Sequence, residues 1–231
     1  MEEMKILICS QDEAFCRRVE RNLALWQEAY CLGCVSERLG WEALPQQEGA
    51  VRFLDLRDAA SYIYVPRDAA TVVAAANDAQ AIESYRYHPA ALLRVDFSYA
   101  EFCEAMGRCH PLWRQYLRRL ELTFHREPVR LALCHLHYAE ADGRETVLSC
   151  AGTAMRASAS LGKIAEQLPS PPFLRCQKSF LVNLGAIREM SGGRLTMTDG
   201  RSIPVARARV QELADAVGAW NAARGTEVRV T

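Results

Sequence analysis

The sequence predicts two domains, an α/β domain with a doubly wound parallel sheet followed by a mainly antiparallel β domain. In the first half, short apolar runs alternate with stripes of helical period, which is typical of a parallel sheet. In the second half, short strands are joined by tight turns. The 231 residues, half of them apolar, are enough for two separate cores. We expect the first domain at residues 1–110, a linker helix at 111–121 and the second domain at 122–231.

Local patterns predict the elements of the first domain. Four apolar runs are the expected strands: Ile6–Ile8, Phe53–Leu56, Thr71–Ala76 and Ala91–Val95. A stripe of helical period predicts the first helix: Phe15, Val19, Leu23 and Trp26. Ser98 and Glu101 have the spacing of a capping box, which predicts the start of the domain's last helix.

A second amphipathic segment follows this helix. Pro111 interrupts the helical pattern first. The residues beyond it place their apolar side chains on one face of a helix: Trp113, Tyr116, Leu117 and Leu120. We therefore expect a helix at Leu112–Leu122 that links the two domains.

The second half contains two Asp-Gly dipeptides between alternating strand patterns. Asp142-Gly143 and Asp199-Gly200 are both strong signals for two-residue hairpin turns. Two helices are expected among the strands. The first carries Leu161, Ile164 and Leu168, and the second carries Val210, Leu213, Val217 and Trp220.

Composition favours a cytoplasmic protein. The start of the chain lacks the basic segment and long apolar run of a signal peptide. The longest apolar run, Ala69–Ala76, is far shorter than a membrane span, so no membrane partner is expected. The nine cysteines are odd in number and lack CxxC spacing, which indicates reduced thiols.

Charge is distributed unequally between the halves. Residues 1–120 contain 14 Lys and Arg against 17 Asp and Glu, whereas residues 121–231 contain 14 against 11. A net basic domain is the better candidate for binding nucleic acid, although so small an excess is also typical of ordinary solvated surfaces.

The segment Phe173–Asn183, F-L-R-C-Q-K-S-F-L-V-N, carries the strongest functional signal. Strand-forming residues bracket a basic polar stretch. With the hairpin that follows, the segment resembles the LytTR family of bacterial DNA-binding domains, over roughly Leu122–Trp220. The matching residues are Phe173, Arg175, Ser179, Phe180, Val182, Asn183, Pro204, Val205 and Arg207. Gln177 stands where the family often has His, and Ala206 where Ser is usual.

This resemblance implies a β-rich domain that presents loops and strand ends to the major groove of double-stranded DNA. Lys178 and Arg207 are then the expected contacts to base edges, since Lys or Arg to guanine is the commonest specific contact. Arg144 would reach a neighbouring groove, and Gln177 would affect sequence preference. Three further residues are the expected phosphate contacts: Arg175, Ser179 and Arg209. Asn183 is interpreted as a turn residue that bonds its own backbone.

The first half resembles a response-regulator receiver domain, which has a flavodoxin-like fold. Asp55 matches the phosphoacceptor position. The resemblance places other residues at the remaining active positions: Ser10 and Gln11 for the acidic metal-binding pair, Ala75 for the switch hydroxyl and Val95 for the Lys. Without paired carboxylates Mg²⁺ has few ligands, so we expect a pseudo-receiver that is not phosphorylated. A register shift of one residue would instead restore Asp12 and Glu13, or Arg94.

Other chemistry is not expected, and neither a cofactor nor a metal is predicted. The cluster of Cys134, His135 and His137 resembles a zinc site, but alternation along a strand would put the thiol on the opposite face. The chain has no P-loop, no G-x-G-x-x-G motif and no recognisable cysteine nucleophile, which argues against an enzyme. Cys176 lies between Arg175 and Lys178, so redox sensing there is a further hypothesis beside a buried strand cysteine.

These observations predict a bacterial transcription regulator that acts as a homodimer on repeated half-sites. An unknown signalling protein or ligand would act on the receiver-like domain. The alternative is a protein-interaction module whose DNA domain has lost specific binding, with Gln177 and Ala206 as the signs of that loss.

Overall fold

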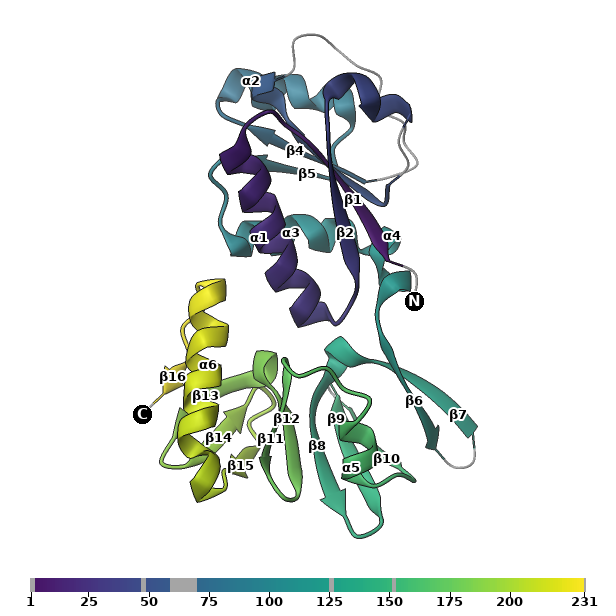
Figure 1. Cartoon of the computed structure of the whole chain (residues 1–231), viewed down its shortest axis with the longest axis vertical. Helices are drawn as coiled ribbons and strands as arrows, with labels where there is room; N and C mark the ends of the chain where they lie inside the picture. Colours follow the sequence, from purple (N-terminus) through teal and green to yellow (C-terminus); the bar gives the residue numbers. More distant parts are fainter. Residues whose placement is uncertain (1–2, 47–48, 59–69, 125–126, 151–152, 231) are drawn as a thin grey trace. The chain divides into compact units, whose positions relative to one another are not determined.

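The computed structural model describes residues 3–46, 49–58, 70–124, 127–150 and 153–230 (Figure 1). The chain divides into two compact units. The first comprises residues 1–27 and 32–116, and the second comprises residues 28–31 and 117–231. Among the helices in the described ranges, none is long and apolar enough to cross a membrane. Ala69, at the start of the longest apolar run, lies outside these ranges.

The first unit contains a five-stranded parallel sheet in the order β2-β1-β3-β4-β5. Its strands are β1 (Met4–Cys9), β2 (Cys34–Leu39), β3 (Val51–Asp55), β4 (Ala70–Ala75) and β5 (Ala91–Arg94). This order is the doubly wound, flavodoxin-like order of receiver domains, so the predicted fold class is confirmed. The four predicted strands are present. Strand β2 has no apolar run in the sequence because it lies at the sheet edge and exposes Ser36 and Arg38.

Helices and 3-10 turns cover both faces of this sheet. The helices are α1 (Glu13–Tyr30), α2 (Asp78–Glu83), α3 (Tyr99–Arg108) and α4 (His110–Trp113). The 3-10 turns are η1 (Trp41–Gln46), η2 (Leu56–Asp58), η3 (Ser84–Tyr87) and η4 (Arg114–Tyr116). On one face, Phe53 of the sheet stacks on Phe102 of α3 with ring centroids 5.5 Å apart. On the other face, Leu54 and Val73 pack with Trp41 and Tyr87.

The capping box at the start of α3 is confirmed, but the predicted linker helix is not. Ser98 and Glu101 cap each other's backbone as the spacing predicted. Helical structure then ends at Tyr116, and β6 (Arg119–Phe124) begins where the helix was expected to continue. Leu120 and Leu122 are both buried there and alternate with exposed residues. Leu120 and Leu122 therefore follow the two-residue period of a strand. The three-residue interval from Leu117 to Leu120, which suggested a helix, does not decide the structure here.

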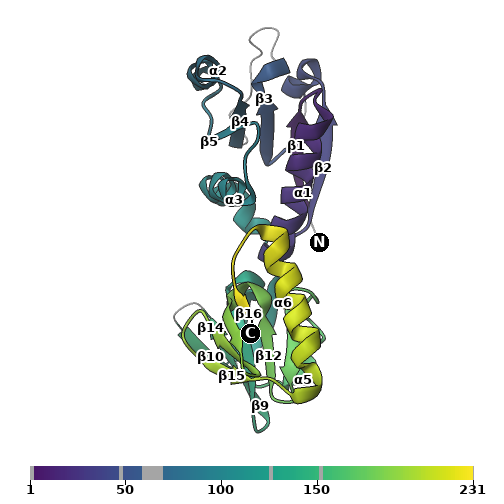
Figure 2. The ribbon, with the colours of Figure 1, turned by 90° about the vertical axis from the view of Figure 1, so that its left-hand side faces the viewer.

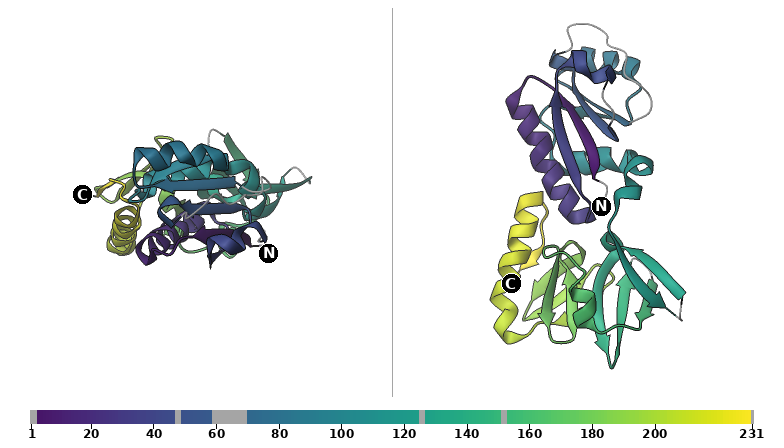
Figure 3. Two further views of the ribbon diagram at one scale, coloured as in Figure 1. Left: turned by 90° about the horizontal axis from the view of Figure 1, so that it is seen from above. Right: turned by 45° about the vertical axis from the view of Figure 1, so that its right-hand side comes forward.

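The second unit is mainly antiparallel β. The largest sheet has the order β10-β9-β8-β12-β11. Its strands are β8 (Leu136–Asp142), β9 (Glu145–Cys150), β10 (Thr153–Ala157), β11 (Phe173–Gln177) and β12 (Phe180–Asn183). A smaller sheet contains β13 (Ile187–Ser191), β14 (Arg194–Met197), β15 (Ser202–Pro204) and β16 (Arg229–Val230). Strands β6 and β7 (Glu127–Ala132) form a separate two-stranded ribbon, visible in the right-hand view of Figure 3.

Two helices complete this unit and each packs against a separate core. Helix α5 (Leu161–Ala165) buries Leu161 and Ile164 against one face of the larger sheet, together with Leu181. Helix α6 (Val210–Arg224) buries its apolar residues against the opposite face and the smaller sheet: Leu213, Val217 and Trp220. Figure 2 shows α6 running along this unit, with its first residues at the same end as the turn that leads into β9.

The hairpins form where the Asp-Gly dipeptides predicted them, with shifted turns. Asp142 still pairs with Glu145, so the first turn consists of Gly143, at φ +63°, and Arg144. The second turn is longer than two residues and spans 198–201. A 3-10 turn, η5 (Leu133–His135), divides the first strand pattern and contains Cys134, so the expected alternation with the histidines does not apply.

Candidate nucleic-acid interface

The Phe173–Asn183 segment is a hairpin, with Lys178 and Ser179 forming the turn between β11 and β12. A bulge shifts the pairing between Arg175 and Gln177. The extra residue, Cys176, is fully buried in the core. The bulge bends the strand toward a turn whose Lys178 side chain is exposed.

Arg207 lies in a short 3-10 turn, η7 (Arg207–Arg209), between β15 and α6. Its side chain is exposed. The preceding Ala206 donates its backbone N–H to the carbonyl of Cys176 at 3.0 Å, which places this turn beside the β11–β12 hairpin. Val205 is buried and anchors the segment in the core.

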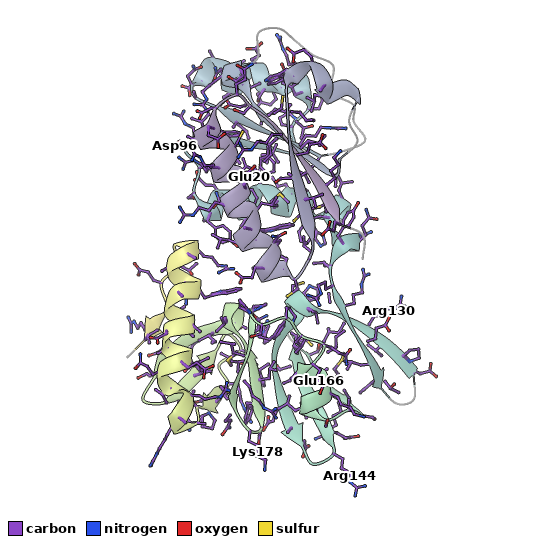
Figure 4. The ribbon with its side chains drawn as sticks, viewed as in Figure 1. Glu20, Asp96, Arg130, Arg144, Glu166 and Lys178 are labelled. Atoms are coloured by element: carbon purple, nitrogen blue, oxygen red, sulfur yellow. The ribbon has the colours of Figure 1, made fainter. Side chains whose placement is uncertain are left out.

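Arg144, the predicted contact to a neighbouring groove, is exposed as well. Figure 4 shows its side chain and that of Lys178 projecting from the same end of the second unit. The first residues of α6 reach this end as well (Figures 1 and 2). In the part of the chain that the structure describes, neither Arg144, Lys178 nor Arg207 forms an ion pair with a carboxylate. Cations that extend into solvent can reach phosphates and base edges.

Arg175 and Arg209, the predicted phosphate contacts, both bond the backbone. Arg175 Nη2 donates to the carbonyl of Lys178 at 2.7 Å. Arg209 Nη1 donates to the carbonyl of Arg175 at 2.8 Å and lies 3.6 Å from a Glu212 carboxylate oxygen. Both side chains therefore have a structural role that the sequence did not reveal.

The remaining motif residues are less exposed than Lys178. Ser179 in the turn and Gln177 beside it are both half-buried. Asn183 accepts the backbone N–H of Gly185 at 2.9 Å, as predicted, and also donates to the carbonyl of Leu136 at 3.0 Å. Burial raises the pKa of Cys176 to about 11, and the thiol is fully buried, so the structure favours the buried strand cysteine over a cation-activated thiol.

In the first unit, Asp55 ends β3 and is fully buried, and a guanidinium neutralises it. Arg57 Nε donates to Asp55 Oδ1 at 3.0 Å, and Arg57 Nη2 donates to Oδ2 at 2.6 Å. The same Nη2 lies 2.7 Å from Asp12 Oδ2. The Ser10 hydroxyl lies 2.9 Å from Asp55 Oδ2 and 3.1 Å from Asp58 Oδ2.

This arrangement places an internal cation among the carboxylates. Hydrogen bonds to Asp55 raise the pKa of Arg57. The backbone N–H of Ala14, and more weakly the charge of Arg57, hold the pKa of Asp12 below its usual value. Asp12 thus lies near the site, as the shifted register required, but it is paired with Arg57.

Arg57 was not predicted from the sequence as a residue of this site. The sequence feature that could have indicated Arg57 is its position two residues after Asp55, which ends a strand. From there a long side chain can fold back onto the carboxylate. At the other active positions, Ala75 ends β4 and provides no hydroxyl, and it pairs in register with Arg94 at the end of β5.

Comparison with known proteins gives a family match in the second unit. The family model of the LytTr DNA-binding domain matches residues 127–218. No curated protein matches the chain.

Similar solved structures include the LytTr DNA-binding domain of a Bacillus cereus protein described as a methyl-accepting/DNA response regulator. It is 22% identical, with a TM-score of 0.39, over 43% of this chain and 96% of that one. The receiver domain of the response regulator NarL from Mycobacterium tuberculosis is 16% identical, with a TM-score of 0.36, over 48% and 98%. A CheY-like response regulator protein from Mesorhizobium loti is 16% identical, with a TM-score of 0.33, over 47% and 99%.

Proposed function

We propose that this chain, whose residues 127–218 form a LytTr DNA-binding domain, is a transcription regulator that binds double-stranded DNA. The exposed cations of Lys178, Arg207 and Arg144 at one end of the domain carry the proposal. Lys178 and Arg207 read base edges in the major groove, while Arg144 reaches the adjoining groove or backbone. Ser179, in the same turn as Lys178, contacts phosphate, and Gln177 beside the turn affects sequence preference.

The receiver-like unit, on this proposal, works without phosphorylation. Phosphoryl transfer to a carboxylate requires a divalent cation to offset the charge of the incoming oxygens. Arg57 already bonds both oxygens of Asp55 and also contacts Asp12, so its guanidinium competes with any metal for these ligands. The chain is accordingly a regulator and not an enzyme, and it has no need of a cofactor.

The input signal is then a protein or small ligand that acts on the first unit. Two copies of the chain bind repeated half-sites as a homodimer, because a domain of this size covers only a short stretch of duplex. The proposal places the regulator with its DNA in the cytoplasm.

Titration of the full chain with duplex DNA tests this function. The duplexes are the region upstream of the chain's own gene and a random sequence of equal length, each measured by fluorescence anisotropy at several salt concentrations. We expect tighter binding to the upstream region and a steep decrease with salt, because phosphate neutralisation releases counterions. A folded protein that binds neither duplex would support the interaction-module alternative.

A further inference from the structure

Two hydrogen bonds join the β11–β12 hairpin to the segment that carries Arg207, and a third lies within the hairpin. The Ala206 N–H donates to the Cys176 carbonyl at 3.0 Å, and Arg209 Nη1 donates to the Arg175 carbonyl at 2.8 Å. Arg175 Nη2 then bridges the turn to the carbonyl of Lys178 at 2.7 Å. Together these bonds form a continuous path from one exposed cation to the other.

We propose that Arg175 and Arg209 are positioning residues, which hold Lys178 and Arg207 at a fixed separation for reading DNA. This inference rests on the proposed DNA binding and deepens it. It assigns to the two arginines a role in sequence specificity, in place of the phosphate contacts that the sequence predicted.

The topology explains why these carbonyls are available. Strand β11 lies at the edge of its sheet, so only β12 pairs with it. An edge strand has backbone groups without a strand partner. The bulge at Cys176 also takes that residue out of the pairing with β12. The carbonyls of Arg175 and Cys176 can therefore accept hydrogen bonds from the segment that follows β15.

The environment of the Arg175 side chain favours an internal role over a contact with phosphate. Its guanidinium bonds a carbonyl of its own hairpin, and its Nε is buried without a hydrogen-bond partner among the described residues. Arg209 is half-buried, and the nearby Glu212 carboxylate offsets part of its charge. Lys178 and Arg207, in contrast, are exposed.

Fixed separation matters because base readout tolerates little displacement. Functional side chains must be held within about 0.5 Å of the productive geometry by the groups that support them. Phosphate attraction acts over a longer range and tolerates a loose turn. Loss of the support should therefore weaken binding to the preferred sequence much more than binding to random DNA.

The full chain with single substitutions tests the inference. Wild-type protein first selects its preferred site from a random duplex library. Affinity for that site and for a random duplex is then measured across salt concentrations for Arg175→Met, Arg175→Lys and Arg209→Met. Arg130→Met, an exposed arginine of β7, is the matched control for the loss of one positive charge.

We expect Arg175→Met and Arg209→Met to lower the ratio of specific to random affinity by at least about tenfold with little change in the salt slope. Arg175→Lys should behave like Arg175→Met, because a flexible lysine side chain does not hold its ammonium at the place where Arg175 Nη2 meets the Lys178 carbonyl. Circular dichroism checks that each variant is folded. Should Arg175→Met not fold, Arg175→Lys and Arg209→Met still decide the question.

Two results would overturn the positioning role. One is an equal loss on both duplexes with a salt slope smaller by about 1, and with wild-type behaviour of Arg175→Lys, which would identify phosphate contacts. The other is an unchanged affinity ratio in all variants. Wild-type protein that binds no DNA would instead refute the proposed function on which the inference depends.

Discussion

Lys178 and Arg207 are exposed on two different turns, so each can be removed without opening a core. We expect Lys178→Ala and Arg207→Ala each to cost about 1 to 3 kcal/mol on the preferred site and less on random DNA, because they lose a base contact. Paired titrations on both duplexes measure the difference. Equal losses on the two duplexes would show that the residue contacts phosphate instead.

Arg57 is a second single residue with a testable role, because its guanidinium pairs with the Asp55 carboxylate. Arg57→Ala leaves a fully buried carboxylate without its guanidinium and should lower the free energy of unfolding of the first unit by roughly 1 to 3 kcal/mol. The variant frees Asp12 and Asp55 together, so we expect Mg²⁺ to stabilise it while leaving the wild type unchanged. Urea unfolding with and without Mg²⁺ measures both effects.

Arg94→Ala, at an exposed position at the end of β5, is the control for the loss of an arginine from this unit. A wild-type protein that Mg²⁺ stabilises as strongly as the Arg57→Ala variant would show that the guanidinium does not compete with the metal.

Among the elements, the β8–β9 turn requires a residue that tolerates positive φ. Gly143 has φ +63° in the β8–β9 turn, and a Cβ there would meet no neighbouring atom within 4 Å, so only backbone strain opposes a side chain. Gly143→Ala should destabilise the second unit by about 1 to 2 kcal/mol, whereas Gly143→Asn should cost less. Gly218→Ala, inside α6 and equally open, should stabilise by about 1 kcal/mol. Similar changes in stability for Gly143→Ala and Gly218→Ala would contradict the positive φ of Gly143.

Elements with a strong local pattern could be predicted from the sequence, and others could not. Thr71–Ala76 and the Ser98–Glu101 cap specify their structures within a few residues. Leu117, Leu120 and Leu122 fit a helix and a strand almost equally, and burial of alternate residues decides for the strand. Tertiary context, which single-sequence patterns lack, settles such segments.

Some features of the candidate DNA-binding site could likewise be predicted from the sequence, and others could not. The exposure of Lys178, Arg207 and Arg144 follows from their places at turns. The motif predicted Lys178 and Arg207 as DNA contacts, and the Asp142-Gly143 turn predicted Arg144. The bond from Arg209 to the Arg175 carbonyl depends on an edge strand meeting a segment about thirty residues further along the chain, which no local pattern encodes.

At the scale of the whole molecule, the DNA-binding unit should be separable. A fragment of residues 117–231 includes all of β6, whereas one that begins at residue 121 would lose the buried Leu120. We expect the longer fragment to unfold cooperatively and to bind random DNA with the salt dependence of the full chain, since the exposed cations lie within it. Thermal unfolding and anisotropy titrations test this. A fragment that is unfolded at 25 °C would show that the first unit is needed for stability.

In an ordinary phosphorylation switch, phosphorylation of Asp55 in the first unit would change DNA binding by the second. The residues around Asp55 do not favour such a switch. Arg57 occupies both oxygens of Asp55, and Ala75 provides no hydroxyl to sense a phosphoryl group. Incubation of the full chain with acetyl phosphate and Mg²⁺ should therefore give no phosphoryl adduct by mass spectrometry and no change in DNA affinity. A stable adduct on Asp55 that tightens DNA binding would establish an ordinary phosphorylation switch, and Arg57 would then have to leave the carboxylate for the reaction to occur.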